Sequence, residues 1–333
     1  MFSIIFILII FSKITKSGNN ANMVDSKYPV PSSKKRIIAI FLLVITTVLW
    51  GTSFILTKNI TENVPIFLYM GLRFAIAFLG FSPLLLHLKY LNKRIILMSL
   101  VTGMIYFFGY AFQTYGLQTT TAGKAGFVTG LSAIIVPFIL WFGFKKPLNR
   151  RVWIALPFSV LGMTFLLLEG ESGISIGDLI VLVSAFFWAL FIVYNDKYVP
   201  NVEIFSYSMI QMAVISISSF ISSLLLGESY TSLSLSPSFW WVMVYMGIGV
   251  MTLTIFFQNW SQRYQGPTKT AIIFTLEPVF AALFGFIIGN EILSLSGWLG
   301  CGLIFIAIII IVLKKDDHNN KNSKKKQFTA DRT

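Results

Sequence analysis

Long apolar segments, separated by short polar connections, constrain this chain more than any other feature. A helix that crosses a hydrocarbon core of about 30 Å needs about 20 mostly apolar residues. Ten such runs occur, at 37–57, 65–87, 96–117, 121–143, 152–169, 176–195, 203–226, 238–260, 267–289 and 294–313. Only 12% of the residues are charged, against about 25% in soluble domains, which excludes a soluble fold. We predict an all-α integral membrane protein of ten transmembrane helices.

The positions of the basic residues predict the orientation of these helices. A net charge of +13 would indicate a nucleic-acid partner in a soluble protein, but here the lysines and arginines lie between apolar runs. Nearly all 26 fall on one side of the membrane; the other side receives only Lys58 and Lys124, and Arg73 lies within a helix. By the positive-inside rule we expect both termini in the cytoplasm, the lipid bilayer as a partner, and no nucleic acid.

The two ends of the chain differ from the apolar middle. Residues 1–35 are predicted as an N-terminal cytoplasmic segment. Its first eleven residues are too short to span and lack the preceding basic region of a signal peptide, so Met23 is an alternative start and 1–22 a possible mis-called extension. Residues 314–333 form a lysine-rich polar segment, predicted as a basic cytoplasmic tail.

The chain contains an internal repeat. A shift of 145 residues aligns 112–153 with 257–298 without a gap, and a shift of 138 aligns the earlier helices. We therefore predict two related five-helix units, 36–170 and 176–313. Because five is odd, the second unit enters the membrane from the opposite side, which makes the repeats inverted. Inverted repeats are typical of alternating-access carriers; the alternative is that duplication built a larger helical scaffold.

Three motifs carry a resemblance to a known family. They are Leu49-Trp50-Gly51-Thr52-Ser53-Phe54, Lys124-Ala125-Gly126-Phe127 leading to Pro137, and Leu276-Glu277-Pro278-Val279-Phe280 leading to Glu291. The chain resembles the EamA-domain family of the drug/metabolite transporter superfamily over both repeats. This resemblance implies a ten-helix bundle that moves metabolites, often outward, across the plasma (inner) membrane. Lys146 departs from the pattern, because the first repeat often has an acidic residue there to match Glu291.

Polar and aromatic residues at helical spacing mark the faces most suited to line a cavity. Trp50 and Trp188 occupy equivalent positions well inside their helices. Tyr69 and Arg73 lie one turn apart in the second predicted helix, and their equivalents in the seventh are Tyr207 and Gln211. Tyr110, Gln113, Gln258 and Asn259 are further candidates for substrate contact. Helix packing is the alternative for the polar groups, and a structural ion pair is the alternative for Arg73.

Three charged residues suggest coupling or gating. Glu277 precedes Pro278 inside the ninth predicted span, which indicates a broken helix beside a cavity and makes Glu277 a candidate for proton coupling. The alternative is a structural acceptor or a partner of Arg73. Lys124 and Lys269 are equivalent residues that open the fourth and ninth spans on opposite membrane sides. They are possible gates, or interfacial lysines whose side chains snorkel.

The residue inventory favours transport of a small molecule over other membrane functions. The predicted helices offer no acid, base and nucleophile cluster and no histidine pair at metal-ligand spacing, so we expect neither an enzyme, a metal nor a cofactor. Cys301 is the one cysteine, which excludes an intramolecular disulfide. A receptor or scaffold is the main alternative; a lipid-modifying enzyme and a channel fit less well. The expected substrate is an amino acid-like or other amphipathic metabolite.

Overall fold

The computed structural model describes residues 33–82, 92–145, 148, 150–167, 175–230, 236–289 and 294–312, and the regular structure in these ranges is entirely helical. The predicted N-terminal segment up to residue 32 and the predicted tail 314–333 lie outside them. In chain order the helices are α2 (Ser33–Thr61), α3 (Ile66–Gly80), α4 (Lys93–Gly116), α5 (Ala122–Gly130), α6 (Ser132–Phe138), η2 (Ile139–Gly143), α7 (Arg150–Leu167), α8 (Ile176–Tyr198), η3 (Val199–Asn201), α9 (Ile204–Leu225), α10 (Pro237–Val244), η4 (Tyr245–Thr252), α11 (Leu253–Gln265), α12 (Pro267–Phe274), α13 (Leu276–Gly289) and α14 (Leu295–Val312). Every predicted span contains described helix.

Seven helical stretches in the described ranges are long and apolar enough to cross a membrane, judged by length and composition. They are Ser33–Thr61, Lys93–Gly116, Ala122–Gly143, Ile176–Asn201, Ile204–Leu225, Pro237–Gln265 and Pro267–Ile288. Two shorter apolar helices, Ile66–Gly80 and Leu295–Ile310, accompany them. The chain is therefore a multi-pass membrane protein, and the full count of ten crossings stays a prediction.

Three of the predicted spans are interrupted rather than continuous α-helices. The ninth breaks at Thr275, between α12 and α13, because Pro278 has no N–H to donate to the carbonyl of Phe274. The fourth breaks at Leu131, one residue beyond the position equivalent to Thr275, although the residue equivalent to Pro278 is Ala133. The eighth contains a π-helical stretch, η4, which hydrophobic periodicity does not predict.

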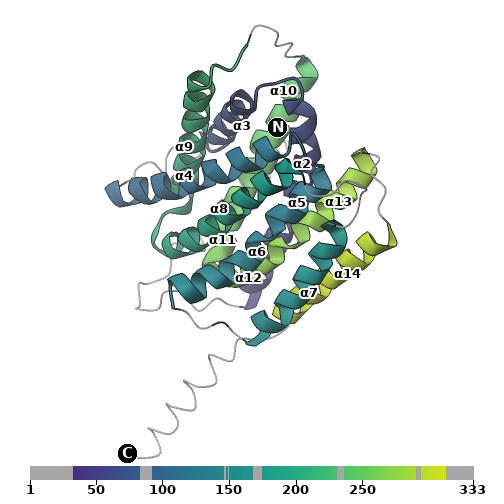
Figure 1. The fold of residues 1–333 in the computed structure, drawn as a ribbon. Helices are drawn as coiled ribbons and strands as arrows, with labels where there is room; N and C mark the ends of the chain where they lie inside the picture. The colour runs from purple at the N-terminus through teal and green to yellow at the C-terminus, as the bar shows by residue number, and fades with distance from the viewer. Residues whose placement is uncertain are drawn as a thin grey trace, which may run out of the picture.

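The two halves of the chain pack through exchanged contacts. Helix α2 of the first half packs on α11 and α13 of the second, and α8 of the second half packs on α4, α5 and α6 of the first. Equivalent helices also meet their own counterparts, α3 with α9 and α7 with α14 (Figure 1). Every one of these contacts joins the first half to the second, so the interior of the bundle is built jointly by the two repeats.

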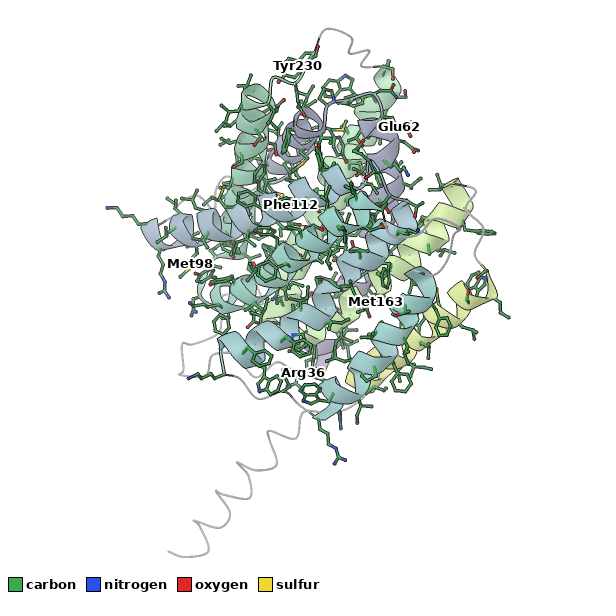
Figure 2. All side chains as sticks on the ribbon, in the orientation of Figure 1. Arg36, Glu62, Met98, Phe112, Met163 and Tyr230 are labelled. Carbon is green, nitrogen blue, oxygen red and sulfur yellow. The ribbon has the colours of Figure 1, made fainter. Side chains whose placement is uncertain are left out.

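The two ends of the bundle are marked by charged residues (Figure 2). Arg36, near the start of α2, stands at the opposite end from Glu62, which follows that helix. Tyr230 lies at the Glu62 end. Under the predicted topology the Arg36 end faces the cytoplasm.

At the Glu62 end, α3 receives its N-terminal cap from the other half of the chain. The first N–H groups of a helix need acceptors, and Pro65 at the cap position supplies no side chain that can accept. The carboxylate of Glu228 accepts from the N–H groups of Phe67 and Leu68, both at 2.9 Å. In the second repeat the residue equivalent to Pro65 is Glu203, which caps α9 locally.

Candidate functional site

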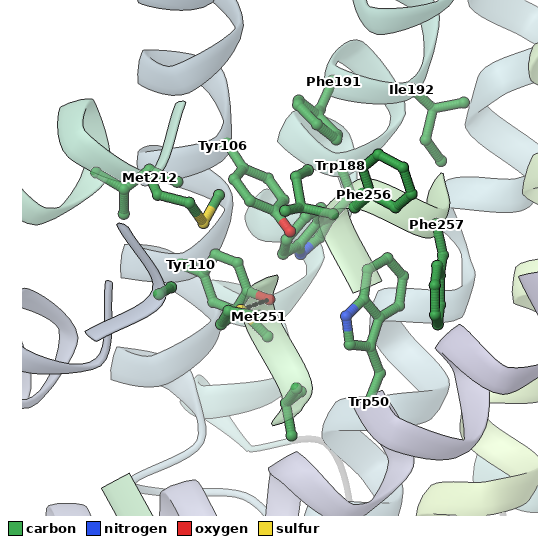
Figure 3. Packing of buried hydrophobic residues seen from close by; sticks show 14 of the residues in the cluster. Trp50, Tyr106, Tyr110, Trp188, Phe191, Ile192, Met212, Met251, Phe256 and Phe257 are labelled. Atoms are coloured by element: carbon green, nitrogen blue, oxygen red, sulfur yellow. Dashed lines mark hydrogen bonds between the residues drawn. The ribbon is translucent and has the colours of Figure 1, made fainter. Parts of the chain in front are cut away.

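An aromatic cluster forms the centre of the bundle, where the two repeats meet. The ring centroids of Trp50 on α2 and Trp188 on α8 lie 6.2 Å apart. Tyr106 and Tyr110, from α4, pack edge-on against Trp188 at 4.9 and 4.8 Å (Figure 3). The hydroxyl of Tyr110 donates to the sulfur of Met251 at 3.1 Å. The equivalent tryptophans thus meet each other, as expected for residues near a twofold relation between the repeats.

A cavity opens beside this cluster and is lined by residues of both repeats. Its walls are Trp50, Ser53, Tyr110, Gln113, Thr129, Ser132, Trp188, Ile192, Gln258, Phe274 and Glu277. The structure therefore brings together Trp50, Tyr110, Gln113, Trp188, Gln258 and Glu277 from the predicted candidates. Glu277 and Ser132 occupy equivalent positions and both line the cavity, each within the first two residues after a helix break.

The predicted candidates leave out five of the lining residues: Ser53, Thr129, Ser132, Ile192 and Phe274. Thr129 and Phe274 are equivalent positions in the ungapped part of the repeat, three residues before Ser132 and Glu277. Residues three apart share a face of a continuous helix. The candidate Glu277 and its counterpart Ser132 therefore indicated that Phe274 and Thr129 would face the same cavity. Ile192 carried no such signal, because an apolar residue looks the same facing a cavity or a neighbouring helix.

Arg73 lies behind the cavity wall, in a cluster of its own. Its side chain is buried, and Nη1 donates to the Tyr69 hydroxyl at 3.0 Å and to Thr57 at 3.3 Å. The Thr57 and Tyr69 hydroxyls are themselves 2.8 Å apart. The guanidinium carbon lies 5.5 Å from the ring centre of Tyr110, which does line the cavity. Within the described residues, Nε and Nη2 of Arg73 have no hydrogen-bond partner.

The equivalent residues of the second repeat form a fully buried polar network. The Tyr207 hydroxyl bonds to Asn195, the counterpart of Thr57, at 3.0 Å, which reproduces the Thr57–Tyr69 contact. Gln211, the counterpart of Arg73, donates to Thr102 at 2.8 Å and accepts from Asn259 at 3.2 Å. Tyr207, Gln211 and Asn259 therefore hold helices together and do not line this cavity.

Comparison with known proteins identifies the family. A model of the EamA-like transporter family matches the chain twice, over residues 37–168 and 175–313. The chain belongs to the EamA-like transporter family. The two matches cover most of the residues between the predicted N-terminal segment and the tail, and each takes in one of the predicted repeats.

Relatives of this EamA-like protein carry transporter names. An uncharacterized transporter of Archaeoglobus fulgidus is 29% identical over 83% of this chain and 86% of its own length. The uncharacterized inner membrane transporter YedA of Escherichia coli K12 is 24% identical over 79% of this chain and 86% of its own length. A solved crystal structure covers 83% of this chain and 96% of its own with a TM-score of 0.69 and 19% identity, a likeness of fold.

The remaining predicted residues of the EamA-like chain lie away from the cavity. Lys124, in the first turn of α5, is buried, and Lys269, in the first turn of α12, is half-buried. Neither lines the cavity, and their role as gates stays a prediction. Within the described ranges, no three histidine, cysteine, aspartate or glutamate residues gather as a metal site.

Proposed function

We propose that this protein is a secondary transporter that exports small amphipathic metabolites, amino acid-like compounds among them. The observation that carries the proposal is the cavity between the repeats, with aromatic walls and a few polar groups. Ligand sites in membrane carriers lie at such repeat interfaces. Membership of a transporter family supports the same reading.

The proposed mechanism is alternating access between two inverted five-helix repeats, 36–170 and 176–313. It requires ten crossings with both termini in the cytoplasm of a plasma-membrane protein. Support comes from the exchanged packing of α2 and α8 and from equivalent contacts such as Thr57–Tyr69 and Asn195–Tyr207. Two arrangements of similar energy are expected when each half can adopt the conformation of the other.

Glu277 is the proposed site of proton coupling. It is buried, it faces the cavity, and no hydrogen bond from a described residue reaches its carboxylate. A carboxylate in this position can exchange a proton with the cavity during the cycle. Glu277→Gln should abolish uphill movement of substrate while sparing downhill exchange at saturating substrate, because the neutral amide keeps the shape of the side chain but cannot bind or release a proton. Loss of folded protein in the variant would instead assign Glu277 a structural role.

The experiment that tests transport is a thermal-shift screen of purified protein against metabolites and drugs, followed by flux of each hit in proteoliposomes. Flux would be measured with and without a pH gradient, using empty liposomes as the control. Gradient-dependent flux supports a proton-coupled carrier. A stabilising ligand that binds but never crosses would favour a receptor, the second candidate function.

A further inference from the structure

The cavity wall is built twice, once by each repeat, and the two copies can be compared residue by residue. Four pairs of lining residues occupy equivalent positions in the two repeats. These pairs are Trp50 and Trp188, Gln113 and Gln258, Thr129 and Phe274, and Ser132 and Glu277. Differences in hydrogen bonding within these pairs therefore show where the cavity departs from symmetry.

The two tryptophans differ in what their N–H groups contact. Nε1 of Trp50 donates to the hydroxyl of Thr254 at 3.0 Å. The residue equivalent to Thr254 is Gly109, which packs against Trp188: a Cβ added there would lie 3.4 Å from the indole. Because glycine offers no hydroxyl, the buried Nε1 of Trp188 has no hydrogen-bond partner among the described residues. The N–H of Trp50 is therefore engaged, whereas the N–H of Trp188 is available to a ligand; Figure 3 shows the two indole rings.

The two glutamines differ in the same direction. Nε2 of Gln113 donates to the hydroxyl of Thr129 at 2.9 Å. At the position equivalent to Thr129 stands Phe274, which cannot accept such a bond. Both amide atoms of Gln258 are buried and lack a partner within the described part of the chain. The unpartnered groups of the cavity wall thus belong to the second repeat. The same repeat carries Glu277 at the position where the first repeat has Ser132.

Buried polar groups without partners are rare, because each costs about 1–3 kcal/mol relative to a bonded one. A ligand that supplies the missing partners recovers this cost. The three groups together define the chemistry of a complementary ligand. It would place a cation beside the Glu277 carboxylate and a hydrogen-bond acceptor beside the Trp188 N–H and the Gln258 amide. In the first repeat, the N–H of Trp50 already bonds to Thr254 and the amide of Gln113 to Thr129, so these donors need no ligand.

We propose that Trp188, Gln258 and Glu277 form a polar subsite for the substrate's head group, and that this head group combines an ammonium with a neighbouring carboxylate or carbonyl. The apolar remainder of the substrate lies against Trp50, Phe274 and Ile192. This assignment rests on the proposed function, because it takes the cavity to be the substrate site. It gives the symmetric scaffold a substrate orientation that the repeat alone does not define.

The test uses three probes that share one side chain: L-leucine, 3-methylbutylamine, which lacks the carboxylate, and 4-methylpentanoate, which lacks the amine. Binding to the purified full-length protein is measured by calorimetry. Wild type should bind leucine about tenfold more tightly than the amine, the effect of one hydrogen bond to a charged group. Trp188→Phe should lower this preference, because only the Gln258 amide then remains as a donor, whereas Trp50→Phe, at the equivalent position, should keep it. Glu277→Gln should weaken the binding of leucine and of the amine, and should strengthen that of 4-methylpentanoate, because the change removes a negative charge that repels its carboxylate.

Several outcomes would overturn the subsite. The ratio of leucine to amine affinity is independent of how much protein folds, so an equal fall of this ratio in both tryptophan variants contradicts the assignment. Absence of binding by all three probes also refutes the proposed head group. The binding measurement needs no membrane, so leucine that binds as described but is not carried in proteoliposomes would refute transport and leave the subsite standing.

Discussion

Replacing Gly51 with alanine should loosen the contact between α2 and α13. A Cβ at this position would lie 2.6 Å from the Cβ of Phe280 and 2.8 Å from its carbonyl carbon. Real Cβ atoms essentially never approach closer than 3.0 Å, and ordinary contact begins at 3.4 Å. The obstacle includes main chain, so a side-chain rotation cannot remove it, and α13 would have to move by about 0.8 Å.

We expect this movement to lower the free energy of unfolding by about 1–3 kcal/mol, the usual cost of overpacking a close contact. The measurement is an SDS unfolding titration of the purified protein in mixed micelles. Gly302→Ala is the matched control, because it makes the same change in α14 where no atom lies within 4 Å. The control should be neutral or stabilising by up to about 1 kcal/mol through helix propensity.

The second repeat already shows that the effect is local. Its residue equivalent to Gly51 is Ala189, which is fully buried. A methyl group is therefore accommodated at this position on α8, whereas on α2 it would meet the main chain of α13. Equal stability of Gly51→Ala and Gly302→Ala would refute this reasoning. Because Glu277 lies one turn from Phe280 on α13, the Gly51 variant should also weaken any ligand that contacts Glu277.

Two further predictions concern residues outside the cavity. Arg73→Gln copies the residue of the second repeat, Gln211, and should change the melting temperature little, because an amide can replace the Nη1 bonds to Tyr69 and Thr57 and the other two nitrogens have no described partner; a large loss of folded protein would contradict this. Glu228→Gln should destabilise the protein by about 1–2 kcal/mol in the same titration, because a neutral amide caps α3 less well than a carboxylate. Glu203→Gln is the equivalent change in the second repeat. If neither variant loses stability, the capping argument is wrong.

The sequence predicts the helical segments well, because long apolar runs and the turn residues between them indicate where each helix begins and ends. It predicts half of the cavity through Trp50, Trp188, Gln258 and their repeat partners. It does not distinguish a polar residue that faces a cavity from one that joins two helices, since both avoid lipid equally. Asn259 therefore belongs to the helix-joining network and its neighbour Gln258 to the cavity.

Arg73 illustrates a second limit of the sequence. A basic residue inside a predicted span must avoid lipid, and Arg73 does. Its depth along the span does not show which cavity or neighbouring helix the side chain faces. The structure places it behind Tyr110, beyond the cavity wall. The π-helical stretch Tyr245–Thr252 marks a third limit, because its packing against α3 depends on tertiary contacts such as Thr252 with the Ala77 carbonyl.

The cap that Glu228 places on α3 makes one repeat depend on the other. The first repeat has Pro65 where the second has its own capping glutamate, Glu203, so the start of α3 is completed only when both halves are present. Produced as two separate polypeptides, the second half would retain this helix start and the first would lose it.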